Sequence, residues 1–117
     1  MENIGLLVTQ DRTKAVITVI EKPVEKELAF LYKKIGCKNV DVVRGDCHGL
    51  KFDIWLDDEG LFASGSPVWE LKGMQIAGKL IIVKGSDDVG RTTWFNEEEK
   101  EEVIESLKEI KYIGYVK

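Results

Sequence analysis

The amino-acid sequence predicts an α+β fold: one domain, 1–117, with a strongly bent, mostly antiparallel sheet. Short apolar runs rich in β-branched residues recur along the chain and are separated by turn residues, which is typical of strands. Two other stretches show the helical spacing of apolar side chains. The most apolar run lies between Gly73 and Gly85, so residues 80–83 are predicted to form a buried central strand. A chain of 117 residues is enough for one hydrophobic core.

An N-terminal β-hairpin and a helix are the first predicted elements. Residues 4–9 and 15–20 are the two apolar runs of the hairpin, joined by a polar turn. Pro23 fits the first turn of the helix, because its missing N–H is not needed there, and Gly36 fits the helix end. The helix is expected to face the core with Val24, Leu28, Leu31, Tyr32 and Ile35.

Further strands are predicted in the middle of the chain. Residues 40–44 form one, and residues 50–56 form another, in which apolar and polar side chains alternate. A turn at 57–60 leads to a return strand at 61–64. Residues 68–72 are predicted to form a single helical turn or an irregular crossing.

The last part of the chain predicts a short β-type run at 91–95 and then a C-terminal helix packed on one side of the sheet. Asn96 and Glu99 have the spacing of a capping box at the start of this helix. Its apolar stripe consists of Val103, Ile104, Leu107 and Ile110. Residues 112–116 are expected to be an edge strand or a packed tail.

Charge and composition exclude several classes of partner. The net charge is −4, and no cluster of Lys and Arg is present, so double-stranded nucleic acid is not an expected partner. The longest apolar run, residues 80–83, is far shorter than the ~18 residues that a membrane-spanning helix needs, so no membrane partner is expected. The N-terminus carries no basic segment followed by an apolar one, which predicts a cytoplasmic location.

Several motifs follow one another in a fixed order between residues 40 and 107. They are a Val-Asp-Val-Val-Arg strand at 40–44, an Asp-Glu-Gly turn within 57–60, a Gly-x-x-Ile-x-Gly bend at 73–78, the apolar strand at 80–83, and an aromatic strand with a capped helix at 95–107. This order resembles the domain of unknown function family 3846. The resemblance implies a small protein of a phage, plasmid or other mobile element that acts against or alongside host systems, and the family has no assigned activity. Family members have a polar Asn before the bend, where this chain has residues 64–69.

Candidate catalytic and metal-binding residues are few. Cys37, Cys47 and His48 are the soft metal ligands of the chain, one fewer than a structural zinc site takes. The carboxylates at 57–59 and 87–88 fall in turns, where short polar side chains bond their own backbone. A non-enzymatic protein without metal or cofactor is therefore favoured. A small hydrolase that uses Cys47 and His48, or the turn carboxylates, ranks third, after the two binding functions described below.

The candidate ligand-binding residues are Trp69, Trp94, Arg91 and Arg44. The two tryptophans stand near polar residues, so their rings could stack on a planar ligand, whereas packing in the core is the alternative for each ring. The two arginines could meet anionic groups of the same ligand.

Two functions are consistent with these observations. The first is a binding protein of a phage or mobile element that sequesters a small molecule, such as a nucleotide-type signal of host defence. The alternative is a protein–protein inhibitor or adaptor, in which the acidic C-terminal helix or an open sheet edge meets a host protein. A homodimer is a further option, because exposed sheet edges need covering.

Overall fold

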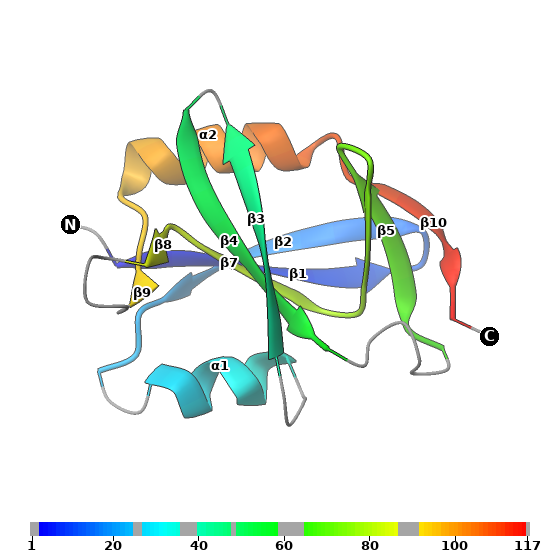
Figure 1. Ribbon diagram of the computed structural model, residues 1–117, viewed down its shortest axis with the longest axis horizontal. Helices are drawn as coiled ribbons and strands as arrows, with labels where there is room; N and C mark the ends of the chain where they lie inside the picture. The colour runs from blue at the N-terminus through cyan, green and yellow to red at the C-terminus, as the bar shows by residue number, and fades with distance from the viewer. Residues whose placement is uncertain are drawn as a thin grey trace.

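A five-stranded antiparallel sheet forms the centre of the fold (Figure 1). The computed structural model describes residues 3–24, 27–35, 40–47, 49–58, 65–86 and 92–116. The strand order across the sheet is β2 (Lys14–Glu21), β1 (Ile4–Asp11), β7 (Leu80–Val83), β4 (Leu50–Asp57) and β3 (Val40–Cys47). The predicted α+β class, N-terminal hairpin and antiparallel sheet are confirmed.

Strand β7 is the central strand, as the sequence predicts. All four of its side chains are fully buried, because the strand has a neighbour on each side and a covered surface on each face. Ile82 pairs with Leu6 and Ile54, while Ile81 pairs with Leu7 and Trp55. Successive side chains point to opposite faces of a strand, so β7 contributes to a hydrophobic cluster on each face.

Helix α1 (Glu27–Ile35) covers one face of the sheet. Leu31 and Ile35 pack there against Ile81 and the neighbouring apolar side chains. Val24 is predicted to face the core, but it lies outside the helix and is fully exposed. The predicted helix end at Gly36 lies outside the described residues.

Helix α2 (Glu97–Leu107) and a small sheet cover the opposite face, as Figure 1 shows. The strand order of the small sheet is β10 (Lys111–Tyr115), β5 (Pro67–Leu71) and β6 (Met74–Ala77). Neither helix of the described residues is long and apolar enough to cross a membrane. The buried residues of this face are Ile4, Leu6, Val8, Phe52, Ile54, Trp69, Leu71, Ile76, Leu80, Ile82, Phe95, Val103 and Leu107.

The prediction of a helical turn or irregular crossing at 68–72 is wrong, because most of this segment is strand β5. Trp69 and Leu71 point into the core and alternate with less buried neighbours, which is the period of a strand. Lys72 and Gly73 both have positive φ, 49° and 85°, and they form the two-residue turn of the β5–β6 hairpin. The turn, and not a helix, reverses the chain here.

The remaining strands belong to small sheets outside the main one. β8 (Gly85–Ser86) pairs with β9 (Thr92–Thr93), and Phe95 forms an isolated bridge with Ile4. Of the two alternatives for the C-terminal segment, the edge strand is confirmed as β10. Arg91 and the return strand predicted at 61–64 lie outside the described residues.

The capping box of α2 is confirmed. The Asn96 side chain accepts a hydrogen bond from the Glu99 N–H (2.8 Å), and the Glu99 carboxylate accepts one from the Asn96 N–H (3.0 Å). Both donors would otherwise lack a partner within the helix. The cap therefore fixes where α2 starts, just after Phe95 enters the core.

Replacing Asn96 by alanine is expected to lower the free energy of unfolding by about 1 kcal/mol, because the Glu99 N–H loses its acceptor. Urea denaturation followed by circular dichroism measures this difference. Asn96→Ser retains an acceptor at the same place and should lose much less. Equal losses in the two variants would contradict the capping role.

Candidate functional site

Trp69 is a core residue in the structure. Its side chain is fully buried, and its ring lies edge-on to Tyr112, with centroids 5.8 Å apart and the planes inclined by 71°. The indole N–H donates a hydrogen bond to the Gly78 carbonyl (3.0 Å). The ring thus offers no exposed face on which a ligand could stack.

Trp94 is also a core residue, on the opposite face of the sheet. It is 2% exposed and belongs to the cluster of Leu31 and Ile81, whereas Trp69 belongs to the α2 side. The sheet therefore separates the two rings, and the structure does not bring them together. For both rings, packing in the core is the arrangement observed.

Arg44 lines a small hollow of about 150 Å³ together with Lys51, Asp53, Lys84 and Gly85. Strand pairing brings these residues together, since Arg44 is opposite Asp53 and Asp53 is opposite Val83. The sequence prediction missed Lys51 and Lys84. The alternation in residues 50–56 places Lys51 and Asp53 on one face, but only the pairing of β4 with β3 and β7 adds the other residues.

The charges at this hollow are partly paired. Burial raises the pKa of the Asp53 carboxyl, and Arg44 offsets part of this effect from 3.9 Å away. The Lys84 ammonium lies 2.9 Å from the Glu99 carboxylate. Although burial opposes it, the Asn96 N–H and Lys84 together lower the pKa of Glu99. Glu99 thus links the hollow to the start of α2.

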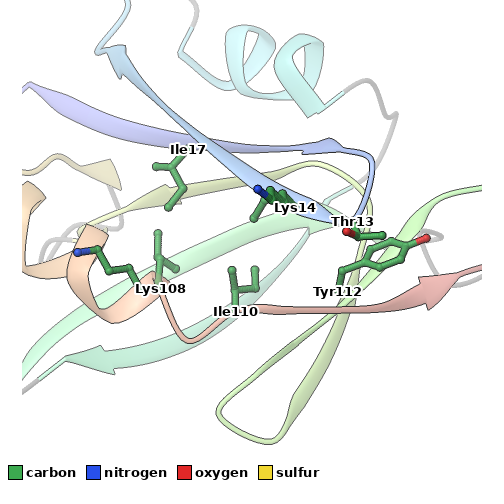
Figure 2. Close-up of a pocket in the computed structure, with 8 residues that line it drawn as sticks. Thr13, Lys14, Ile17, Lys108, Ile110 and Tyr112 are labelled. Carbon is green, nitrogen blue, oxygen red and sulfur yellow. The ribbon is translucent and has the colours of Figure 1, made fainter.

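A larger apolar groove of about 320 Å³ lies between β2 and β10 (Figure 2). Both strands are at the edge of their sheets. The apolar side chains Ala15, Ile17, Leu107, Ile110 and Tyr112 line the groove, and Thr13, Lys14 and Lys108 supply its polar groups. Figure 2 shows Ile17 and Lys14 on one side and Lys108, Ile110 and Tyr112 on the other.

The free edge of β2 borders this groove. On β1, Ile4 exchanges both backbone hydrogen bonds with Phe95 (3.0 and 2.8 Å), so its backbone groups point away from β2. The N–H and C=O groups of successive residues in a strand point to alternate sides. Just after β2, the Lys22 N–H donates to the Asn3 carbonyl just before β1 (2.8 Å), which places the even-numbered residues on the β1 side. The even-numbered residues of β2 therefore bond to β1. The backbone groups of Ala15, Ile17 and Val19 point outward, and no described residue bonds to them.

The other edge of the main sheet, β3, is partly protected. By the same alternation, Val42 and Asp46 have their backbone groups on the outer side. The Val42 N–H donates to the Asp41 carboxylate (2.9 Å), and the Asp46 carbonyl accepts from the Lys72 ammonium (3.0 Å). Charged residues on an edge strand discourage pairing with another chain. The backbone groups of Arg44 also point outward, but those of its neighbours on this edge are engaged, so β2 is the more open edge of the main sheet.

The residues predicted for the hydrolase alternative are not placed. Cys37 and His48 lie outside the described residues, as does the side chain of Cys47. Among the residues that the structure does describe, no three His, Cys, Asp or Glu side chains gather closely enough to hold a metal ion.

No protein-family model matches the chain, and no curated protein or solved structure matches it either. The resemblance of residues 40–107 to family 3846 therefore stays a prediction.

Proposed function

We propose that the protein is a non-enzymatic binding domain that captures an extended segment of a partner protein along the edge of β2. The observation that supports this proposal is the coincidence of two features. Ala15 and Ile17 line the apolar groove with their side chains and present unpaired backbone groups at the same edge. One extended segment could place its side chains in the groove and bond its backbone to β2 at the same time.

The physical basis is the addition of a strand to a sheet. Main-chain hydrogen bonds to the edge strand provide affinity, and a pocket for alternate side chains provides specificity. Val19 is 47% exposed on the same strand, so it adds apolar surface beyond the groove. The partly protected edge of β3 leaves β2 as the better place for such an addition.

Charge defines the chemistry of the segment. The charged residues that line the groove are Lys14 and Lys108, and no described carboxylate lines it. Lys108 pairs with Glu105 (2.8 Å), but both side chains are largely exposed, so this ion pair is weak. The segment that fits best alternates apolar side chains with acidic ones.

This function corresponds to the inhibitor or adaptor that the sequence offers as an alternative. The resemblance to family 3846 would place it in a phage or mobile element, with a host protein as its partner. Capture of a planar small molecule by stacked tryptophans has less support, because the rings of Trp69 and Trp94 are buried.

The test uses an eight-residue peptide in which valine and glutamate alternate, titrated into ¹⁵N-labelled protein. We expect the amide signals of Ala15, Ile17 and Val19 to move most, because their N–H groups point outward and gain partners. The signals of Val16 and Thr18 should move less. A peptide with lysine in place of glutamate should bind more weakly, because its charged side chains lie on the same face as Lys14, opposite to the face of its valines.

Val19→Pro removes one outward N–H donor from β2 and should weaken peptide binding at least tenfold. Val42→Pro is the matched control: it removes an outward N–H from β3, at a valine of similar exposure (40%). Circular dichroism confirms that each variant is folded. Equal affinity of the two variants would contradict the proposal. So would a dimer of the free protein, seen in sedimentation, that Val19→Pro dissociates, because the occupant of the edge would then be a second copy.

A further inference from the structure

The hollow at Arg44 gathers positive charge on a protein whose net charge is −4. Its three cations come from different segments: Arg44 from β3, Lys51 from β4, and Lys84 from the residue after β7. Among the described residues that line it, Asp53 supplies the one carboxylate, and that side chain is nearly buried. With Glu99, which pairs with Lys84, three cations face two carboxylates, so one positive charge is left in excess.

The cations differ in how firmly they are held. The Lys84 ammonium is fixed by Glu99 at 2.9 Å, and Glu99 is fixed in turn by the capping box of α2. The Arg44 side chain is 85% exposed, and its Nε is 3.9 Å from the Asp53 carboxylate, which is too long for a hydrogen bond. Its guanidinium group can therefore turn to a second anion and meet two of its oxygens.

The size of the hollow sets the size of its ligand. At about 150 Å³ it is smaller than the ~300 Å³ at which sites for drug-sized molecules begin. Gly85 lines this space without a side chain, and its φ of 126° is one that other residues rarely adopt. The hollow can hold one small anionic group, with the rest of the molecule outside.

We propose that this hollow binds the phosphate group of a small phosphorylated molecule. A phosphate monoester carries close to two negative charges at neutral pH and offers three acceptor oxygens, which suits three cationic donors that approach from different strands. The site goes beyond the function proposed above, because it shares no lining residue with the β2–β10 groove.

The test is a titration of the ¹⁵N-labelled protein with inorganic phosphate and with adenosine monophosphate at low, constant ionic strength. We expect the amide signals of Lys51 and Gly85 to move and to saturate with both, while adenosine leaves them unchanged. Arg44→Gln and Lys51→Gln should each weaken phosphate binding about tenfold. Asp53→Asn removes a negative charge from the lining and should strengthen phosphate binding.

Lys79→Gln is the matched control, because it removes one positive charge at the opposite end of β7 from Lys84. It should leave phosphate binding unchanged. Equal weakening by Lys79→Gln and Lys51→Gln would overturn the proposal, since net charge alone would then explain binding. Chloride that moves the same signals as strongly as phosphate would also overturn it. These outcomes do not bear on the edge of β2, which is tested with a different ligand.

Discussion

Replacing Trp69 by alanine is expected to lower the free energy of unfolding by about 3–5 kcal/mol. The ring is fully buried between the main sheet and the small sheet, so its removal leaves a cavity that the surrounding strands cannot fill without moving. The substitution also removes the partner of the Gly78 carbonyl and the edge contact with Tyr112. Natural domains have about 5–15 kcal/mol of stability in all, so this loss is large.

Urea denaturation followed by circular dichroism measures the loss, and Trp69→Phe is the matched control. Phenylalanine keeps an aromatic ring in the core and loses the indole N–H, so its loss should be smaller. A Trp69→Ala variant as stable as the parent protein would contradict the core role. If that variant instead lost affinity for a small molecule, Trp69 would be a binding residue, as the sequence predicts.

Replacing Gly45 by alanine is expected to lower the free energy of unfolding by about 1–3 kcal/mol, because it adds an atom to a place that is already filled instead of leaving a cavity. A Cβ at this position would lie 2.4 Å from the Phe52 ring, well inside van der Waals contact. Gly45 and Phe52 are direct partners across β3 and β4, and Phe52 is buried, so the ring has little room to move. Thermal unfolding measures the effect as a lower melting temperature.

The double variant Gly45→Ala with Phe52→Leu tests the cause. If ring overlap is responsible, the second substitution should destabilise the Gly45→Ala protein less than it destabilises the parent protein. Arg44→Ala, at the exposed neighbouring position, should change stability by only about 0.5 kcal/mol. Strictly additive effects of the two substitutions would show that another property of Gly45 is responsible.

The parts of the fold that the sequence predicts correctly are those with local signals. The apolar run at 80–83 predicts a central strand whatever its neighbours are, and Asn96 with Glu99 predicts the start of α2 from residues three positions apart. The prediction for residues 68–72 is wrong because it does not recognise Lys72 and Gly73 as a hairpin turn, and because the second neighbour of β5, strand β10, comes from the far end of the chain. Val24 was mispredicted because helical spacing does not show where a helix begins.

The candidate site depended on distant contacts and was less predictable. The sequence identifies Trp69 as an aromatic residue among polar neighbours, but only the small sheet folding onto the main sheet buries it. Arg44 was identified, whereas Lys51 and Lys84 join it through the pairing of three strands. The open edge of β2 could be anticipated only in general terms, because which backbone groups point outward depends on the register with β1.

The position of β7 in the sheet determines when the main sheet can form during synthesis of the chain. The β1–β2 and β3–β4 hairpins are each continuous in sequence, yet in the sheet they meet only across β7. A nascent chain that ends before Leu80 can form both hairpins but cannot join them. Its β1 and β4 edges stay exposed until the central strand emerges from the ribosome, and contacts this distant in sequence form slowly. Synthesis must therefore reach Val83 of the 117 residues, about 70% of the chain, before the main sheet can exist.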